Sequence, residues 1–390
     1  MTKTTAPQGS NSTRSRSRNR QVVLAQIQSA GEMGRAEIAR SLGLSTQAVS
    51  NIIADLLAEG LLVEKGTRST GRGLPAVLYA LNPSGAFALG VEIRPNAIFV
   101  ALLNMLGEPV YEQRVQSPST DPAEICAILL KQRDAALAAA KAPFDRLLGA
   151  GVVMPGPFGK TGLSGKGTDL PGWDQVDAQP LFQEVLGVPV EVSNDANAAA
   201  MAERITGAAK GLQSYAYLYF GMGLGLGLVS QGHLIPGAFG NAGEIGHIPV
   251  PYDGRSVPLE TVLSRASLTR CLQSDDQENI DFDQLKLMFV AGDERLNSWL
   301  VSAASALGHA LHIVENLFDP QTVVLGGAMP EALLDKLVAM VDPSIASVSH
   351  RMDNDLPRLQ RGVSGRMTAT RGAAALILNH TFTPQIAVAA

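Results

Sequence analysis

The sequence predicts an α/β protein in which a small winged helix-turn-helix head precedes a body of two α/β lobes. Thirty-nine glycines and 22 prolines interrupt short apolar runs, which is typical of an α/β architecture with many tight turns. The chain has 390 residues, of which 46% are hydrophobic, and this is enough for two or three domains with cores of their own. In the body, strands twice open a lobe as a meander and then alternate with helices.

Charge divides the chain into a basic head and an acidic body. Residues 1–82 hold ten Lys and Arg against five Asp and Glu, which leaves 21 basic and 31 acidic residues for the remainder. This asymmetry indicates that the head, and not the body, meets a polyanion. Residues 1–19 are rich in Ser, Thr and Arg and contain nothing to build a core. They predict a basic arm that stays disordered until an anion orders it.

Composition also excludes several classes of protein. No run approaches the roughly 18 apolar residues of a membrane span, and no apolar core follows the N-terminal charges. The two cysteines, Cys126 and Cys271, belong to no cluster with other Cys or His residues. This argues against a disulfide framework and against a cysteine-built metal site. We therefore expect a cytoplasmic protein with no membrane partner.

Residues 20–82 predict the winged helix-turn-helix. Apolar residues mark a first helix near 22–27 and a second over 36–42, after which Gly43 breaks the chain and Ser45 can cap a third helix. The short turn between the second and third helices is the helix-turn-helix arrangement. The inward residues of the third helix are spaced i, i+3, i+4, i+7 and i+8: Val49, Ile52, Ile53, Leu56 and Leu57.

The outward face of the third helix carries side chains that can meet base edges in the major groove. They are Thr46, Gln47, Ser50 and Asn51. Any surface helix also presents polar residues outward, so this face alone does not establish DNA binding. Two short strand patterns that follow predict a β-hairpin wing with Arg68 and Arg72 near its tip, suited to phosphates or a minor groove. Helices, wing and arm together predict binding to operator DNA, and we include Arg35 and Ser45 in the DNA-binding set.

The body follows from Ala88. The expected strands are 88–93, 98–103, 110–115, 148–154, 190–193, 215–220 and 322–325, and the expected helices are 123–140, 196–205, 296–316 and 371–378. The segment 273–294 is acidic and poorly periodic, and we assign it only a surface-exposed role. We expect the first lobe over 86–194 with the return of a C-terminal helix (371–385), and a second lobe over 195–370 for sugar binding and oligomerisation.

Five short motifs give this pattern a family resemblance. They are Pro-Gly-Pro at 155–157, Leu-Pro-Gly-Trp at 170–173, Asn-Asp-Ala-Asn-Ala-Ala at 194–199, Gly-Glu-Ile-Gly-His at 243–247 and Val-Leu-Gly-Gly at 324–327. With the helix-turn-helix they resemble the ROK family (repressors, open reading frames and kinases), in its DNA-binding repressor branch. The resemblance spans about residues 20–375. It implies the two-lobed actin-like ATPase and sugar-kinase fold.

The sugar half of the family's site looks intact. Asn194 and Asp195 follow the strand 190–193, at the carboxyl end where α/β proteins bind ligands, and such side chains suit the hydroxyls of a polyol. In ROK kinases the matching Asp is the general base, whereas here we expect Asp195 only to hold the hydroxyl, as a vestige with no catalytic role. An Asn-Asp pair can also simply cap the next helix. The resemblance adds Glu244 and His247.

Three further positions depart from the family or match it less firmly. Glu260 matches another sugar-contacting Glu, and Asp169 stands where many members have Asn. Family members usually hold a structural zinc with this His and three Cys. Here the aligned residues 251–258 (Pro-Tyr-Asp-Gly-Arg-Ser-Val-Pro) contain no thiolate, so we expect no metal and no other cofactor. Prolines would stiffen this loop instead.

The nucleotide half looks dismantled. Family kinases have Asp-x-Gly-Gly-Thr at the first strand turn, and this chain has Glu92-Ile93-Arg94-Pro95-Asn96. Pro95 lacks an N–H and Arg94 places a large side chain where bare backbone must approach phosphate. A second loop, 221–227, keeps four glycines but has Met222 where the kinases have Thr, and its glycines are equally explained by strand and turn geometry.

These features predict a sugar-responsive transcriptional regulator, by default a repressor, of carbohydrate metabolism genes. Its partners would be operator DNA, a sugar or sugar derivative, and further copies in a homodimer or homotetramer. Closure of the two lobes around the sugar would alter the spacing of paired heads. Two alternatives stay open: a bifunctional sugar kinase that still uses ATP, and a regulator that answers to a protein partner.

Overall fold

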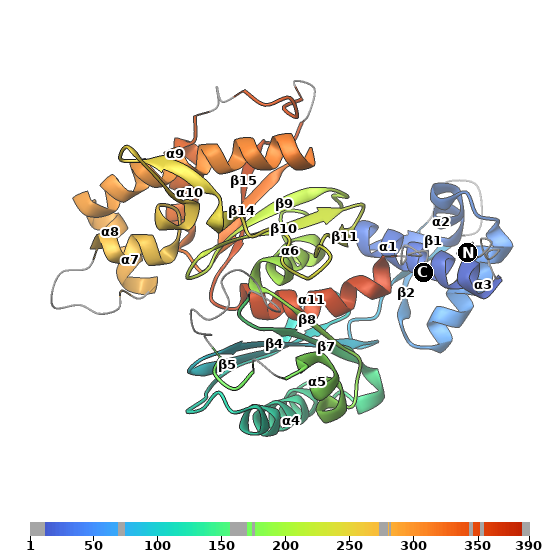
Figure 1. Ribbon diagram of the computed structural model, residues 1–390. Coiled ribbons are helices and arrows are strands. Elements are labelled where there is room, and N and C mark those ends of the chain that lie inside the picture. Colours follow the sequence, from blue (N-terminus) through green and yellow to red (C-terminus); the bar gives the residue numbers. More distant parts are fainter. Residues whose placement is uncertain are drawn as a thin grey trace, which may run out of the picture. The chain divides into compact units, whose positions relative to one another are not determined.

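The computed structural model describes residues 12–68, 75–156, 170–173, 176–272, 280, 282–342, 346–351 and 355–383 (Figure 1). By their contacts the residues form two compact units. The first holds the chain up to Ala86 together with Asn104–Leu106 and the chain from Leu378, and the second holds Phe87–Leu103 and Gly107–Ile377. No helix within these ranges is long and apolar enough to span a membrane.

The first unit is a winged helix-turn-helix. Its elements are α1 (Ser12–Ala30), β1 (Glu32–Gly34), α2 (Arg35–Leu42), α3 (Thr46–Ala58), β2 (Leu62–Arg68) and β3 (Ala76–Leu81), with the strands in the order β1-β3-β2. Helix α3 begins where the Ser45 hydroxyl accepts the N–H of Ala48 at 3.2 Å, the cap that the sequence predicts. Four of its five predicted inward residues are buried and Leu57 is half-buried.

Helix α1 begins at Ser12, so the prediction of a disordered arm over residues 1–19 is wrong for residues 12–19. Arg16 lies 2.5 Å from Asp55, and Arg20 makes two hydrogen bonds of 2.8 and 2.5 Å with Glu59. Asp55 on α3 and Glu59, the C-cap of that helix, are one turn apart, so they pair with arginines that are one turn apart on α1. This part of α1 thus contacts α3 through ion pairs. Residues 1–11 lie outside the described part of the chain.

The first lobe of the second unit is built on a five-stranded sheet. Its strands are β4 (Phe87–Arg94), β5 (Ala97–Asn104), β6 (Pro109–Gln116), β7 (Leu147–Val153) and β8 (Val190–Ser193), in the order β6-β5-β4-β7-β8. Strands β4, β7 and β8 are mutually parallel, and their register places Glu92, Val153 and Ser193 in one row. Their carboxyl ends therefore meet at one edge of the sheet. Helices α4 (Pro122–Ala139) and α5 (Ala178–Leu186) bury one face of this sheet.

The second lobe is built on a sheet of order β11-β10-β9-β14-β15. Its strands are β9 (Tyr215–Phe220), β10 (Leu224–Ser230), β11 (His233–Leu234), β14 (Val323–Gly327) and β15 (Leu359–Ser364), and its helices are α6 (Asp195–Thr206), α7 (Arg265–Leu272), α8 (Phe282–Ala291), α9 (Glu294–Phe318) and α10 (Glu331–Met340). The segment 273–294, expected only at the surface, contains α8, whose Leu285 is buried and whose Met288 and Phe289 pack on the core. Residues 285, 288 and 289 form one helical face. Three apolar positions are too few to reveal a helical period in a segment that is otherwise acidic.

Two helices lie between the sheets of this unit, α6 and α11 (Thr368–Phe382) (Figure 1). Helix α11 approaches β4 and β7 so closely that a Cβ atom at Gly90 would lie 2.1 Å from the Thr370 carbonyl oxygen. At Gly151 a Cβ would lie 1.9 Å from the Ala373 carbonyl oxygen. Because real Cβ atoms do not approach that closely, glycine is required at both positions. Residues 368–377 of this helix belong to the second unit and the residues from 378 to the first.

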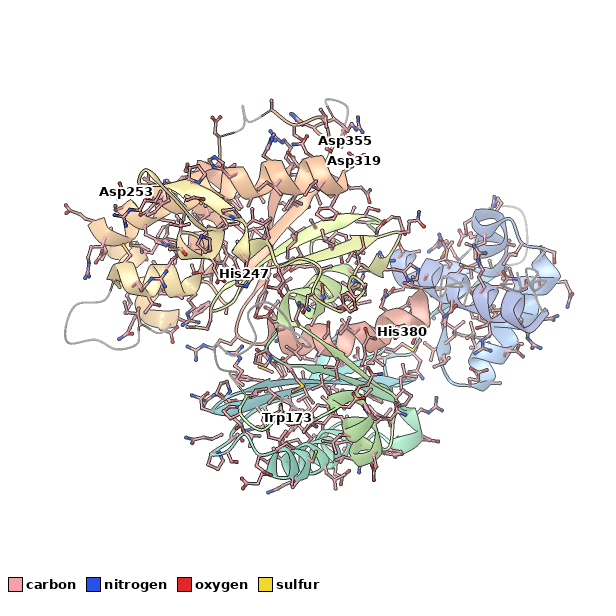
Figure 2. All side chains as sticks on the ribbon, in the orientation of Figure 1. Trp173, His247, Asp253, Asp319, Asp355 and His380 are labelled. Atoms are coloured by element: carbon pink, nitrogen blue, oxygen red, sulfur yellow. The ribbon has the colours of Figure 1, made fainter. Side chains whose placement is uncertain are left out.

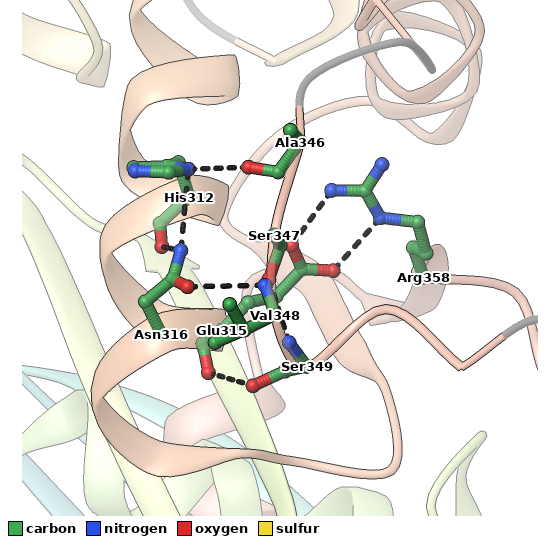
Figure 3. Close-up of polar contacts among 8 residues, drawn as sticks. All are labelled: His312, Glu315, Asn316, Ala346, Ser347, Val348, Ser349 and Arg358. Carbon is green, nitrogen blue, oxygen red and sulfur yellow. Dashed lines mark hydrogen bonds and ion pairs between the residues drawn. The ribbon is translucent and has the colours of Figure 1, made fainter.

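The end of α9 holds the segment before β15 through a buried ion pair (Figure 3). Arg358 donates to both carboxylate oxygens of Glu315, at 2.9 Å from Nε and 2.7 Å from Nη2, and the two side chains are only 16% and 6% exposed. The Ser349 hydroxyl donates to the Glu315 carbonyl oxygen at 2.5 Å. His312 Nδ1 lies 2.8 Å from the Ala346 carbonyl oxygen, and the Val348 N–H donates to Asn316 Oδ1 at 3.2 Å. This cluster fixes the approach to β15 and so the position of the sheet edge.

Candidate functional site

Asp195 and Asn194 lie where β8 gives way to α6, at the carboxyl edge shared by β4, β7 and β8. Asn194 Oδ1 accepts the N–H of Asn197 at 2.8 Å, so the helix-capping interpretation of this residue is confirmed. Asp195 is the first residue of α6, and its Oδ1 accepts the N–H of Ala196 at 2.8 Å. Asp195 is thus the first carboxylate of the site and Asn194 the cap that orients the helix.

The surroundings of Asp195 disfavour its charge. Burial is the largest cause and the nearby carboxylate of Glu92 the next, and together they raise the pKa of Asp195 to about 6. The Ala196 N–H and the guanidinium of Arg94 act in the opposite direction, and Glu244 adds to the rise. Asp195 is therefore mostly ionised at neutral pH, at a cost in free energy, and acidification to pH 5 would leave it mostly protonated.

Glu244, His247 and Glu260 come together beside it (His247 is labelled in Figure 2). His247 Nε2 lies 3.7 Å from Glu244 Oε2, and His247 Nδ1 lies 3.9 Å from Glu260 Oε1. Two short 3-10 turns position them, η2 (Ile245–His247) and η3 (Leu259–Thr261). Burial raises the pKa of Glu244, the imidazole of His247 lowers it, and Glu260 raises it again.

The glycines of the segment 221–227 make room for this cluster and for α6. A Cβ atom at Gly221 would lie 3.0 Å from Asp195 Oδ2, and one at Gly223 would lie 2.5 Å from Glu260 Oε2. Gly225 and Gly227 belong to β10 and face Ala196, with a Cβ at Gly227 only 2.5 Å from the Ala196 carbonyl oxygen. The close packing of Gly225 and Gly227 against α6 accords with the strand-geometry interpretation of these two glycines. Met222, at the turn, is 71% exposed.

The turn after β4 carries a guanidinium. Arg94 Nε donates to Glu92 Oε1 at 2.6 Å, and the Arg94 guanidinium lies over the Phe99 ring, 4.6 Å from its centroid. Glu92 is 4% exposed, and its second oxygen accepts the hydroxyl of Thr370 at 2.8 Å. This turn therefore presents a paired side chain rather than bare backbone. The pairing of Glu92 with Thr370 on α11 is a contact that the sequence pattern did not indicate.

The segment 249–258, where the family resemblance implies a zinc loop, is a β-hairpin. Strands β12 (Pro249–Tyr252) and β13 (Arg255–Pro258) pair from Pro249 with Pro258 to Tyr252 with Arg255. Asp253 and Gly254 form the two-residue turn with φ values of 49° and 69°, as in the type I′ turns favoured by Asp-Gly (Asp253 is labelled in Figure 2). In the described ranges no group of three His, Cys, Asp or Glu side chains could hold a metal ion. Among residues 249–258 the only such side chain is that of Asp253, and one carboxylate does not fit the four ligands of a structural zinc site.

The predicted DNA-facing residues lie on the first unit. Thr46, Gln47 and Asn51 are exposed and Ser50 is half-exposed, and Gln47 Nε2 donates to Asn51 Oδ1 at 3.0 Å. Arg35 is exposed and lies over the Tyr79 ring at 5.1 Å.

Two members of the DNA-binding set are already engaged within the head. Ser45 is occupied as the cap of α3, and Arg68 pairs with Glu32 and Glu37 at 3.1 and 3.4 Å. Arg72 and the predicted sugar ligand Asp169 both lie outside the described residues. Next to Asp169, Leu170 and Trp173 are buried, and Trp173 donates to the Thr120 carbonyl oxygen at 2.7 Å (Figure 2).

Comparison with known proteins agrees with this arrangement. A model described as ROK family matches residues 88–380, and one described as MarR family matches residues 22–73. The chain is 24% identical over 368 residues to the xylose repressor of Bacillus spizizenii, covering 93% of this chain and 95% of that protein. The crystal structure of a ROK family transcriptional regulator, a homologue of E. coli MLC protein, aligns with a TM-score of 0.71 at 24% identity, covering 95% of this chain and 98% of that one. The ROK hexokinase of Thermus thermophilus aligns with a TM-score of 0.58 at 27% identity, covering 74% and 97%.

Proposed function

The chain belongs to the ROK family, and on that premise we propose that it is a transcriptional repressor that binds operator DNA and responds to a sugar. One observation carries the proposal. A single chain joins a winged helix with an exposed hydrogen-bonding face on α3 to a cluster of carboxylates and an imidazole at the start of α6. The first feature suits base edges and the second suits hydroxyl groups.

The effector of this proposal is a neutral polyol, held by Asp195, Glu244, His247 and Glu260. Carboxylates predominate among the described side chains of this site, and Arg94, the guanidinium that acts on Asp195, is already paired with Glu92. Such a lining accepts hydrogen bonds from several hydroxyls and opposes further negative charge. Asn194 supports the site as the cap of α6, and Asp169 remains a proposed ligand. No metal and no cofactor take part.

The DNA side of the proposal rests on α3 and its flanks. Thr46, Gln47, Ser50 and Asn51 would meet base edges, Arg35 and Arg72 would meet phosphates, and Ser45 and Arg68 would position the helix and the wing. We propose a homodimer or homotetramer, because helix-turn-helix proteins pair their heads on repeated half-sites. The test is a thermal-shift screen against D-xylose, D-glucose and N-acetyl-D-glucosamine, followed by DNA binding with each hit. If none raises the melting temperature, a regulator controlled by a protein partner replaces this proposal.

Replacing Gln47 by alanine should weaken specific operator binding about tenfold or more, because a side chain that reads base edges contributes roughly 1–3 kcal/mol of discrimination. The measurement is fluorescence anisotropy with an operator selected by the wild-type protein from a randomised duplex library. Sugar-induced thermal stabilisation should be unchanged. The exposed Gln113 on β6 provides the matched control, and Gln113→Ala should bind DNA as the wild type does. Loss of sugar binding in Gln47→Ala would contradict this division of labour.

We propose that the protein is not a kinase. Phosphoryl transfer depends on positioning and on charge stabilisation by close backbone donors, and Arg94 and Pro95 occupy the first phosphate turn. With the same three sugars and Mg-ATP, we expect ADP release at the background rate in a coupled assay. Sugar-dependent turnover that Asp195→Asn abolishes would instead establish a bifunctional kinase.

A further inference from the structure

We propose that the hydrogen bond from Thr370 on α11 to Glu92 on β4 couples the state of the sugar site to the DNA-binding unit. The inference rests on the proposed function and adds the route by which that site is regulated. Glu92 is the central residue of this route, and no sequence motif predicts that it binds the sugar. Glu92 binds Arg94 with one oxygen and the Thr370 hydroxyl with the other, at 2.6 and 2.8 Å.

Glu92 responds to the sugar site through charge. Its carboxylate and the Arg94 guanidinium both act on Asp195, the first in raising and the second in lowering the pKa of that group. A hydroxyl bound at Asp195 would replace water around these three groups, and that changes how strongly the guanidinium is drawn to Asp195 or to Glu92. Glu92 is almost fully buried, so solvent cannot compensate for a change in its pairing with Arg94. Such a change therefore alters the hydrogen bond that Glu92 accepts from Thr370.

Helix α11 contacts both elements that carry the site. The backbone of Thr370 packs closely against Gly90 of β4, two residues before Glu92. Two residues further along α11, a Cβ at Gly372 would lie only 2.0 Å from the carbonyl oxygen of Ala198, in the first turn of the helix that Asp195 begins. Packing this close leaves no space for the elements to move independently, so a shift of β4 or α6 moves α11 as a rigid unit.

The same helix continues into the first unit. The chain passes between the two units after Ala86, Leu103, Leu106 and Ile377, and only the last of these points lies in the interior of a helix. Fifteen helical residues span about 22 Å and transmit displacement better than a loop does. Within the first unit, the carbonyl oxygen of His380 accepts a hydrogen bond from Gln21 of α1 at 2.8 Å. Movement of α11 therefore acts on a helix of the DNA-binding unit.

The test compares operator affinity with and without sugar in Thr370→Val, which keeps the shape and removes the hydroxyl. The operator is the duplex selected by the wild-type protein, and the probes are D-xylose, D-glucose and N-acetyl-D-glucosamine. For the wild type we expect a change in operator affinity of about tenfold with at least one sugar, and for Thr370→Val less than about threefold. Both proteins should bind operator alone and sugar alone with similar affinity. Thr370→Ser, which restores the hydroxyl, should regain most of the response.

Thr322→Val is the matched control. Thr322 is also buried, and its hydroxyl donates at 2.7 Å to the Pro357 carbonyl oxygen, away from α11. It should respond to sugar as the wild type does, and urea unfolding should show that both valine variants are folded. A wild-type response that persists in Thr370→Val overturns the coupling while the proposed function stands. A wild type whose operator affinity no sugar changes overturns the proposed function and this inference with it.

Discussion

Asp195→Asn is expected to abolish sugar-induced stabilisation and, at pH 7.5, to raise the melting temperature of the unliganded protein. Asn keeps an acceptor for the Ala196 N–H and removes a charge that burial and Glu92 disfavour. The upward pKa shift corresponds to a few kcal/mol before solvent screening, and we expect about 1 kcal/mol to be realised because the group is only partly buried. For a chain of this size that is about 1–2 °C. Differential scanning fluorimetry with and without each sugar measures both effects.

The pH dependence of this gain has a definite sign. A carboxyl whose folded pKa lies above its unfolded value favours folding below the unfolded pKa, and this contribution is lost as the pH rises through the folded pKa. Here the window runs from about 4 to about 6. The advantage of Asp195→Asn should therefore grow between about pH 4 and pH 6, level off above that range and nearly vanish below about pH 4. The exposed Asp145 gives the control, since Asp145→Asn should change neither property. Retained sugar binding in Asp195→Asn would remove this carboxylate from the site.

Arg358→Met should lower the free energy of unfolding by about 3–5 kcal/mol, because it leaves the Glu315 carboxylate buried without its partner. Urea denaturation measures the loss. The double variant Glu315→Leu, Arg358→Met should recover most of it, since it leaves no unpaired charge in the cluster of Figure 3.

A second bidentate Arg–Glu pair, which is more exposed, tests whether burial or bidentate geometry sets the contribution of such a pair to stability. Arg371 donates to both oxygens of Glu112 at 2.7 and 2.9 Å, with the side chains 38% and 30% exposed. Arg371→Met should cost less than about 1 kcal/mol because water screens that pair. Equal losses for the two arginines would show that burial does not set the contribution of the Glu315 pair.

The fold could be predicted from the sequence where periodicity is strong. Strand β9 has the predicted bounds, and α9, whose apolar face continues over seven turns, was missed only at its ends. Prediction failed where the secondary structure depends on contacts with residues distant in the sequence. The N-terminal arginines of α1 lie in no apolar pattern, and two of them pair with acidic residues about 39 positions later in the chain. Helix α8 hides a three-residue apolar face in an acidic segment.

At the candidate site, family motifs indicated the carboxylates but not their electrostatics. The sequence placed Asp195 at the end of a strand, and the structure adds that Glu92, a hundred residues earlier, faces it across β7. Thr370 lies still further along the chain, and no motif connects it with Glu92. The missing thiolates were readable from the sequence. The hairpin in their place was not predicted, although its Asp-Gly pair is a strong short signal for such a turn.

The hairpin of β12 and β13 has a consequence for the protein in the cell. A loop clamped by thiolates folds only when metal is supplied, and it loosens when an oxidant consumes the sulfur. Here paired backbone amides and a two-residue turn hold the same stretch of chain. The shape of this hairpin is thus expected not to change with the supply of metal or with the oxidation of thiols.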